Sequence, residues 1–579
     1  MILNFAETRL LHLDYLKERG RDVAHFVKRA TGRYYTGELI GRRLAQQVAT
    51  IFYRAHPSVR SISVLDPFGG DGRLIEWLIE GWNSSALPNV RWDIAIWDVD
   101  DVGFRDARER LNGVTARHGV KQSCTFKILD TFSEALERRA SFDLVLTNPP
   151  WELLKPDRRE LAALAATRRA KYVSQMRSYD EWLGRHYPLS QPRRKFAGWG
   201  TNLSRVGFEA SLSLARQGGV VGVVLPASFL ADDQTTELRA HLLTKHAVHL
   251  ATYYPAEAKL YGPADVASIA VALTVRGEPA QALTVETHNN ATRCLEQSSI
   301  RLDLEALRKV DFVMPISFGA KSIALINGLA QRFPTWLDLE SSATDPLWAG
   351  REIDETGIAR WLRPHGGRAP LFIKGRMIGR YATVEAPSQT IERPGWSPPP
   401  STKARRIAWR DVSRLSQKRR MIATLIEAGF VAGNSLGVAY FKDFSETPLL
   451  ALLGVMNSTC FEFQLRAHLA TGHVSLSSLR KVAVPSFVQL RQEGALALLV
   501  GEALVSADSA AFKVDAYVAK NLYRLTEEEY ETILNGFMMT HAERLNYLKS
   551  YCELRGAHPA SKFVSATLVA EPQPAYYLV

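Results

Sequence analysis

Short apolar runs alternate with amphipathic stretches between residues 36 and 277. Runs that are rich in β-branched and other apolar residues, and that are bounded by turn-forming residues, predict buried strands. The predicted strands cover residues 61–65, 94–97, 125–129, 142–147, 219–225 and 267–275, and helices are predicted over 74–81 and 102–117. Strands that alternate with helices indicate a parallel, doubly wound α/β sheet with both faces covered, in which ligands bind beyond the carboxyl ends of the strands.

After the last of these strands the pattern changes to short apolar runs separated by breaker-rich stretches such as 364–370 and 394–400. Residues 488–555 have a helical pattern, in which Thr526 and Glu529 form a predicted capping box. The chain therefore divides into four predicted parts, which are an N-terminal helical segment (1–35), an α/β domain (36–277), a second domain (278–487) and a C-terminal helical region (488–579).

The composition is that of an ordinary globular protein. Of the 579 residues, 46% are hydrophobic and 23% are charged. No apolar run approaches the roughly 18 residues needed to cross a bilayer, and the first residues do not form a secretory signal, so we expect a cytoplasmic protein. The four cysteines have no CxxC spacing, which argues against a metal site and against disulfides. These cysteines are Cys124, Cys294, Cys460 and Cys552.

The formal net charge of +12 favours a polyanionic partner, because Lys and Arg side chains that neutralise phosphates release condensed counterions on binding. A solvated surface that only aids solubility would give the same total charge. The distribution is more informative, since basic residues interleaved with aromatic residues fill residues 155–195 and a second basic stretch covers residues 403–420. We expect these two stretches to form surfaces that contact nucleic acid.

A glycine-rich turn, residues 66–72, follows the first predicted strand. Its glycines let the backbone approach a ligand, and the following helix offers unpaired amides to a carboxylate or phosphate. Asp98 follows the second strand, where a carboxylate can accept both hydroxyl hydrogens of a ribose. Asp130 and Phe132 follow the third strand and offer an acceptor and an aromatic face to an adenine ring. Each acid alone is better explained as a solvated loop carboxylate, whereas three in register favour a nucleoside-containing cofactor.

The fourth predicted strand runs directly into Asn148-Pro149-Pro150-Trp151. The amine of adenine is a poor nucleophile because its lone pair is delocalised into the ring, so an enzyme needs acceptors aimed at both amino hydrogens. The side-chain oxygen of Asn148 and the carbonyl of Pro149 can be these acceptors, on a loop that the two prolines stiffen. Trp151 offers a face on which an extruded base can stack. For the tetrapeptide alone, the alternative is a rigid turn followed by a packed tryptophan.

With these features in this order, residues 33–277 resemble the amino-methyltransferases that carry an Asn/Asp/Ser-Pro-Pro-Tyr/Phe/Trp motif, and in particular the adenine-N6 DNA methyltransferases with the gamma motif order. The resemblance implies a Rossmann-like class I methyltransferase domain that uses S-adenosyl-L-methionine. It also implies that Asn148, Pro149, Pro150 and Trp151 form the catalytic loop. The implied cofactor contacts are Asp66, Phe68, Gly69, Gly70, Asp98, Asp130, Phe132 and Asn148.

Two flanking segments extend the resemblance. Residues 32–36 are similar to the tyrosine-threonine segment that closes over the methionine end of the cofactor. This similarity implies cofactor contacts from Tyr35 and Thr36, although the family usually has proline after the threonine. Residues 218–226 resemble the later strand before a loop that lines the pocket for the target base, which implies that Phe229 is a wall of this pocket.

The long segment after the catalytic domain is where the gamma motif order places a target-recognition domain. Residues 372–381 are similar to the start of such domains, and residues 449–485 to a later part in which residues 476–484 would lead a strand. Together with residues 409–412 and 433–435, they look most like stand-alone adenine methyltransferases of type IIS restriction-modification systems. The resemblance thus implies a C-terminal α+β target-recognition domain with a helical tail. Its candidate DNA contacts are Arg376, Arg410 and Arg414.

The function implied is site-specific methylation of a flipped adenine in double-stranded DNA, as the modification component of a type II restriction-modification system. A cognate restriction endonuclease that acts on the same site would then be a second partner. An RNA adenine methyltransferase shares the chemistry, and a protein-glutamine methyltransferase uses the same loop but is usually shorter. A fused restriction endonuclease is disfavoured because only about 35 residues precede the cofactor segment. A catalytically silent DNA-binding module is the alternative from a different class.

Overall fold

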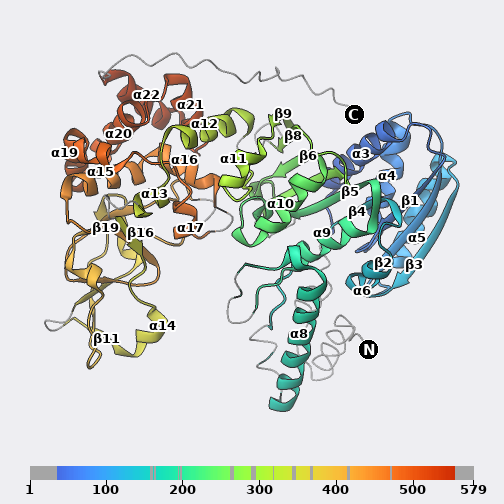
Figure 1. The fold of residues 1–579 in the computed structure, drawn as a ribbon, viewed down its shortest axis with the longest axis horizontal. Helices are drawn as coiled ribbons and strands as arrows, with labels where there is room; N and C mark the ends of the chain where they lie inside the picture. The colour runs from blue at the N-terminus through green and yellow to red at the C-terminus, as the bar shows by residue number, and fades with distance from the viewer. Residues whose placement is uncertain are drawn as a thin grey trace. The chain divides into compact units, whose positions relative to one another are not determined.

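The computed structural model describes residues 35–156, 161, 165–193, 195, 199–260, 266–288, 295–316, 319–341, 347–365, 370–413, 417–469 and 472–554. The chain divides into two compact units between Gly319 and Ala320 (Figure 1). The N-terminal helical segment expected over residues 1–35 lies outside the described residues, except for Tyr35.

The first unit is built on one mixed sheet with the strand order β3-β2-β1-β4-β5-β7-β6-β8-β9. Strands β1 to β5 pair in parallel, and β7 is antiparallel to both of its neighbours. The bounds are β1 Ser61–Asp66, β2 Arg91–Asp98, β3 Gln122–Ile128, β4 Phe142–Thr147, β5 Ala215–Pro226, β6 Ala247–Tyr254, β7 Ser268–Thr274, β8 Ala282–His288 and β9 Leu295–Arg301. All six predicted strands are present, whereas β6, β8 and β9 were not predicted.

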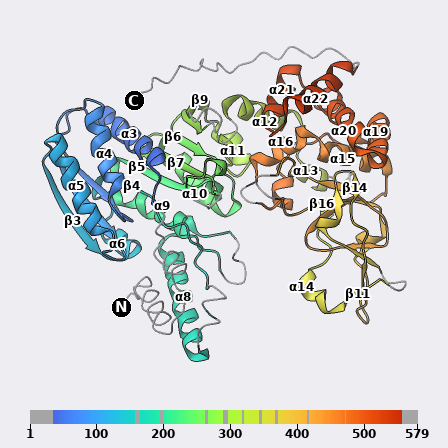
Figure 2. The same cartoon turned by 180° about the vertical axis from the view of Figure 1, so that it is seen from behind.

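Helices cover both faces of this sheet (Figures 1 and 2). On one face, α3 (Glu38–Ala55), α4 (Arg73–Ser84) and α5 (Phe104–His118) share a continuous apolar core with alternate residues of β1, β2, β4 and β5. On the other face, α6 (Thr131–Glu137) packs against α9 (Leu203–Leu214), and α9 packs on β4 and β5. The expected α/β fold, a doubly wound and mostly parallel sheet, is therefore confirmed.

The first unit continues beyond the boundary predicted after residue 277. Strands β8 and β9 extend the sheet through a parallel pairing of β8 with β6 and an antiparallel pairing of β9 with β8. A short helix, α11 (Leu304–Lys309), follows them before the unit ends at Gly319.

One long helix, α8 (Ala166–His186), extends away from the sheet in both views (Figures 1 and 2). Its buried side includes Tyr172, Met176 and Leu183. Lys171 and Arg185 are exposed on the side away from these apolar residues. The helix is therefore anchored along one stripe, and its exposed stripe is mostly basic, with one acid, Glu181, between Arg177 and Arg185.

The second unit combines small sheets with a helical region, as the expected α+β domain and helical tail require. Its two larger sheets have the orders β10-β19-β16-β17 and β11-β15-β12-β18, and a third pairs β13 with β14. The strands are β10 Leu347–Gly350, β11 Leu362–Pro364, β12 Leu371–Ile373, β13 Ile378–Gly379, β14 Ala382–Thr383, β15 Gln389–Ile391, β16 Arg406–Arg410, β17 Ala423–Ile426, β18 Phe430–Ala432 and β19 Leu436–Phe441. The helices are α12 Gly319–Arg332, α13 Trp336–Ser341, α14 Glu355–Ile358, α15 Glu446–Asn457, α16 Thr459–Ala467, α17 Leu476–Leu479, α18 Phe487–Gln492, α19 Gly494–Val505, α20 Ala507–Tyr517, α21 Glu527–Asn535 and α22 His541–Glu553.

Two local predictions in this unit can be compared directly with the structure. The capping box is confirmed, because the Thr526 side chain accepts from the Glu529 amide at the start of α21 and the Glu529 side chain accepts from the Thr526 amide. The strand expected within residues 476–484 was wrong. Helix α17 occupies the start of this segment, and Ala483 makes only an isolated bridge to Thr335.

Among the described residues, no helix is both long enough and apolar enough to cross a membrane. The described cysteines Cys124, Cys460 and Cys552 are free thiols, and Cys294 lies outside the described residues. No group of three or more His, Cys, Asp or Glu side chains within the described ranges could hold a metal ion.

Candidate active site

The glycine-rich turn after β1 is fixed to the end of β2. The Gly69 amide donates to the Trp97 carbonyl at 2.9 Å, and the Gly70 amide donates to the Asp98 carboxylate at 3.0 Å. Gly70 has a φ of 50°, in the left-handed region where a side chain is strained. A Cβ on Gly103 would lie 2.1 Å from the Gly70 carbonyl oxygen, so the start of α5 also approaches this turn closely. The turn therefore presents backbone held by two neighbouring segments.

Three predicted acids stand at the carboxyl ends of three adjacent strands. Asp66 ends β1, Asp98 ends β2 and Asp130 caps α6 directly after β3. Asp98 also accepts from the Val99 amide at 2.7 Å, and Asp130 accepts from the Tyr179 hydroxyl at 3.0 Å. Because each carboxylate oxygen has two lone pairs, Asp98 and Asp130 keep acceptor capacity for a ligand. The structure thus brings the three acids to one edge of the sheet.

Burial raises the pKa of these acids, since a low-dielectric surrounding disfavours the charged carboxylate. The pKa of Asp66 is raised to about 7, against the opposing hydrogen bonds from Thr147 and from the Phe68 amide. Burial likewise raises the pKa of Asp98 to about 6 and shifts the pKa of Asp130 upwards. The edge is therefore a desolvated site in which hydrogen bonds to a ligand are strengthened.

The predicted catalytic loop begins where β4 ends, next to the acid that ends β1. The Thr147 hydroxyl donates to Asp66 Oδ1 over 2.7 Å, and both residues are buried. Asn148 follows Thr147 directly and is half-buried, while Pro149 is buried. One hydrogen bond therefore links the glycine-rich turn to the loop that carries Asn148. Sequence reasoning did not single out Thr147, although it immediately precedes the motif.

Helix α9 packs against the predicted catalytic loop from the second face of the sheet. A Cβ placed on Gly207 would lie 2.5 Å from Pro149 Cβ and 3.2 Å from the Phe68 ring. Only glycine lets this helix contact both the catalytic loop and the glycine-rich turn. Sequence reasoning missed Gly207, and its only signal was a glycine inside an otherwise apolar helical stretch.

The chain leaving the catalytic loop is tied to the residues just before α9. Leu153 bridges Asn202, and the Leu203 amide donates to the Glu152 carbonyl at 2.8 Å. Trp151 is partly buried and packs against the main core. These contacts hold the exit of the loop, so both of its ends are anchored.

Aromatic rings line the region between the glycine-rich turn and α6. The rings of Phe68 and Phe132 lie 5.5 Å apart, and those of Phe132 and Tyr187 lie 6.1 Å apart. Thr36 is buried, whereas Tyr35 is more exposed and its ring faces the Arg73 guanidinium at 4.7 Å. The predicted cofactor residues from segment 35–36, from the turn and from the ends of β2 and β3 thus belong to one unit.

Phe229 lies in a 3₁₀ turn, Ala227–Leu230, directly after β5. Its side chain is 3% exposed and contacts the Phe208 ring edge-on at 5.6 Å. The ring therefore packs against α9, and its predicted role as a wall of the pocket for the target base stays a prediction.

The predicted DNA contacts in the second unit have different surroundings. The Arg376 side chain is 71% exposed and pairs with Glu385 at 3.2 Å. Arg410 is half-buried and donates from Nε to the Ile378 carbonyl at 2.9 Å. Arg414 lies outside the described residues. Of these three, Arg376 is the one shown on an exposed surface.

Much of the second basic stretch, residues 403–420, serves the interior of this unit, contrary to the expected nucleic-acid surface. Arg406 and Glu352 form an ion pair at 2.7 Å in which neither side chain is exposed. Arg419 pairs with the buried Glu462 at 2.7 Å. Buried charges require such partners because an unpaired charge is costly to desolvate. These arginines therefore neutralise buried carboxylates inside the second unit.

No protein-family model matches the sequence, and no curated protein sequence matches it either. Solved structures show distant likenesses. The type IIG restriction endonuclease BpuSI aligns over 94% of this chain and 68% of its own, at 14% identity and a TM-score of 0.42. The type IIL restriction-modification enzyme MmeI, in complex with DNA, aligns over 91% and 79%, at 11% identity and a TM-score of 0.49. A Listeria monocytogenes protein described as a class I S-adenosylmethionine-dependent methyltransferase aligns over 49% and 72%, at 15% identity and a TM-score of 0.29.

Replacing Gly207 with alanine tests the contact between α9 and the catalytic loop. The added methyl meets the rigid ring of Pro149, so we expect Gly207→Ala to lower the free energy of unfolding by about 1–3 kcal/mol. The matched control is Gly113→Ala in α5, where a Cβ meets nothing within 4 Å and helix propensity should add up to about 1 kcal/mol. Urea unfolding measures both variants. Equal stabilities for the two would contradict the close contact.

The raised pKa of Asp66 predicts a pH-dependent stability. The folded-state value of about 7 exceeds the ordinary value of 3.8, so the stability that the protonated carboxyl contributes is lost as the pH rises from about 4 to about 7. Asp66→Asn keeps an acceptor for Thr147 and does not titrate. We expect the free energy of unfolding of the unaltered protein, relative to this variant, to fall over that interval and to be flat above it. Urea unfolding from pH 4 to 8 measures the difference, and a constant difference would refute the assignment.

Proposed function

We propose that this protein is an S-adenosyl-L-methionine-dependent methyltransferase that modifies the N6 amine of a flipped adenine in double-stranded DNA. The observation that carries the proposal is the hydrogen bond between Thr147 and Asp66, which places Asn148 and Pro149 beside the glycine-rich turn. The residues proposed to bind the cofactor and the two proposed acceptors for an amine would then share one edge of the sheet.

The residues at this edge fit the chemistry of the proposed cofactor. Asp98 would accept from the ribose hydroxyls, and Asp130 would accept from the adenine ring, with Phe132 beside it. The glycine-rich turn carries no side chain at Gly69 or Gly70, and the Tyr35 ring lies over Gly70. When bound, S-adenosyl-L-methionine supplies a methyl group that its sulfonium already activates. The protein therefore has to contribute mainly positioning and polarisation.

The catalytic loop would act on the amine of the base. The Asn148 side-chain oxygen and the Pro149 carbonyl each accept one amino hydrogen, which draws the nitrogen lone pair out of the ring. Trp151 stacks on the extruded base, a contact worth about 1–3 kcal/mol. The amine becomes acidic only when methylated, so its proton leaves to solvent without a strong base. This division of roles makes Asn148 essential for the methyl transfer and secondary for cofactor binding.

Double-stranded DNA is proposed as the substrate because α8 presents a basic stripe on the same unit as the site. Lys171, Arg177 and Arg185 are exposed on this helix, and cations in such an array bind phosphates independently of sequence. The second unit is proposed as the target-recognition domain, with Arg376 as a candidate contact. The biological role proposed is modification in a type II restriction-modification system, with a cognate endonuclease acting on the same site.

Replacing Asn148 with alanine tests the chemistry and the substrate together. We expect Asn148→Ala to abolish methylation while the affinity for S-adenosyl-L-methionine changes by less than about threefold, because this loop makes its main contacts with the base. Asn112→Ala, an exposed asparagine on α5, is the matched control and should be fully active. Sequencing of modified bases in DNA and in RNA from cells that express each protein gives the methylated base, its site and the kind of nucleic acid. Methylated adenine with the Asn148→Ala variant, or methylated RNA instead of DNA, would contradict the proposal.

The basic stripe of α8 predicts a salt-dependent contribution to DNA binding. Removing three phosphate contacts should reduce the slope of log K against log salt concentration by about 2–3. The triple variant carries Lys171→Gln, Arg177→Gln and Arg185→Gln. Fluorescence anisotropy with a duplex at several salt concentrations measures the slope.

A charge-matched control keeps this experiment specific. Arg54, Arg138 and Arg139 are exposed near the opposite edge of the sheet, where β1 and β4 begin. Replacing all three with glutamine removes the same total charge and should leave the slope unchanged within about 1. If the control lowers the slope as much as the α8 variant does, the binding depends on net charge and not on α8.

A further inference from the structure

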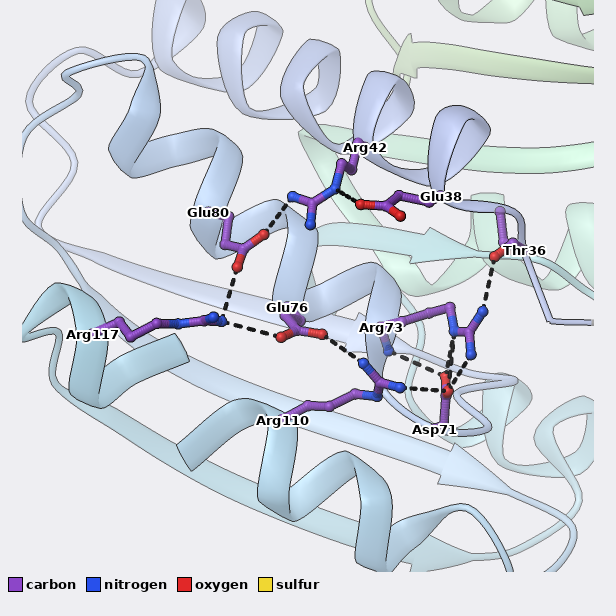
Figure 3. Close-up of polar contacts among 9 residues, drawn as sticks. All are labelled: Thr36, Glu38, Arg42, Asp71, Arg73, Glu76, Glu80, Arg110 and Arg117. Carbon is purple, nitrogen blue, oxygen red and sulfur yellow. Dashed lines mark hydrogen bonds and ion pairs between the residues drawn. The ribbon is translucent and has the colours of Figure 1, made fainter. Parts of the chain in front are cut away.

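Arg73, the first residue of α4, contacts three residues around the glycine-rich turn, of which Figure 3 shows Asp71 and Thr36. It holds the Asp71 carboxylate in a fork, with Nε at 2.9 Å from Oδ1 and Nη2 at 2.6 Å from Oδ2. Its Nη1 donates to the Thr36 carbonyl at 3.2 Å. Its guanidinium also faces the Tyr35 ring, with Cζ at 4.7 Å from the ring centre. One side chain therefore connects residues 35–36 to the turn.

The segment that Arg73 holds lies directly on the glycine-rich turn. A Cβ on Gly70 would lie 3.2 Å from Cε1 of Tyr35, so the tyrosine ring covers the backbone of this turn. Thr36 is buried beside it, and α3 begins two residues later. The position of residues 35 and 36 is therefore set by this contact at one end and by α3 at the other.

The ion pair between Arg73 and Asp71 is well placed to fix this geometry. The Asp71 side chain is 6% exposed and the Arg73 side chain 26% exposed, so solvent screens the pair less than it would on an open surface. Arg110 approaches the same carboxylate at 3.5 Å and also pairs with Glu76. The planar fork of an arginine matches a carboxylate in two bonds, which a lysine cannot reproduce.

The rest of the charged network in Figure 3 lies farther from the turn. Arg117 pairs with Glu76 and Glu80, and Arg42 pairs with Glu38 and Glu80. The Arg117 side chain is 57% exposed, and exposed pairs contribute little. These pairs connect α3, α4 and α5 without touching residues 35–36, which makes Arg117 a suitable control.

We propose that Arg73 is a positioning residue that holds Tyr35 and Thr36 on the glycine-rich turn and thereby sets the affinity of the site for S-adenosyl-L-methionine. The inference rests on the proposed function, in which this segment closes over the cofactor. Arg73 acts through Tyr35 and Thr36, so its loss weakens cofactor binding and leaves the acceptors of the catalytic loop in place.

The test compares Arg73→Ala, Arg73→Lys and Arg117→Ala by two measurements. Calorimetry gives the affinity for S-adenosyl-L-methionine, and hydrogen exchange of the ligand-free protein reports how firmly residues 35–41 are held. We expect Arg73→Ala to weaken binding by about tenfold and to speed exchange of this peptide, because it loses a hydrogen bond and a cation-π contact. Arg73→Lys should recover part of both effects. The rate at saturating cofactor should stay within about twofold of the unaltered enzyme.

A cycle with Tyr35→Ala separates positioning from a general loss of stability. If Arg73 acts through Tyr35, the double variant should bind no more than about twofold more weakly than Arg73→Ala alone. Equal weakening by Arg117→Ala, or unchanged binding and exchange in Arg73→Ala, overturns the inference. An unaltered protein that does not bind S-adenosyl-L-methionine refutes the proposed function instead, and hydrogen exchange then still shows whether Arg73 holds residues 35–36.

Discussion

The hydrogen bond from Thr147 to the buried carboxyl of Asp66 is the contact on which the geometry of the site depends. It joins the end of β4 to the end of β1, and these two strands are neighbours at the middle of the parallel sheet. Because the bond is buried, losing it would remove one of the donors of the Asp66 carboxyl and leave it with the Phe68 amide in a low-dielectric surrounding, which is costly. This buried hydrogen bond therefore fixes the position of the glycine-rich turn relative to the proposed catalytic loop.

Close packing at two glycines further fixes the positions of the turn and the loop. Gly207 lets α9 contact both Pro149 and Phe68, and Gly103 lets the start of α5 approach the Gly70 carbonyl. Packed interiors transmit small displacements because they have few voids. The site is thus braced from both faces of the sheet, while the side that holds residues 35–36 depends on the polar contacts of Arg73.

The sequence predicts the strands that carry the site and the side chains at their ends, because apolar runs and chemical motifs are both local signals. Strand β6 was not predicted because His249, Thr252 and Tyr253 interrupt its apolar run. In the structure it nevertheless pairs inside the sheet. The sequence also did not predict which residues contact the site residues, and the reason is different. Tyr179 reaches Asp130 from 49 positions away, and no periodicity shows which helix will pack on which loop. Local sequence patterns thus predict which residues lie at the edge of the sheet. Tertiary packing determines which other segments contact them.

The two basic stretches also show that the sequence alone does not determine which charged side chains are exposed. Both contribute to a formal net charge of +12. However, Arg406 and Arg419 form ion pairs with carboxylates inside the second unit. Their charges are neutralised at short range and add little to the field outside the protein. On α8 the apolar stripe is buried, so Lys171, Arg177 and Arg185 have to face solvent. The charge available to a polyanion is therefore fixed by which helices are amphipathic and not by how many arginines the chain contains.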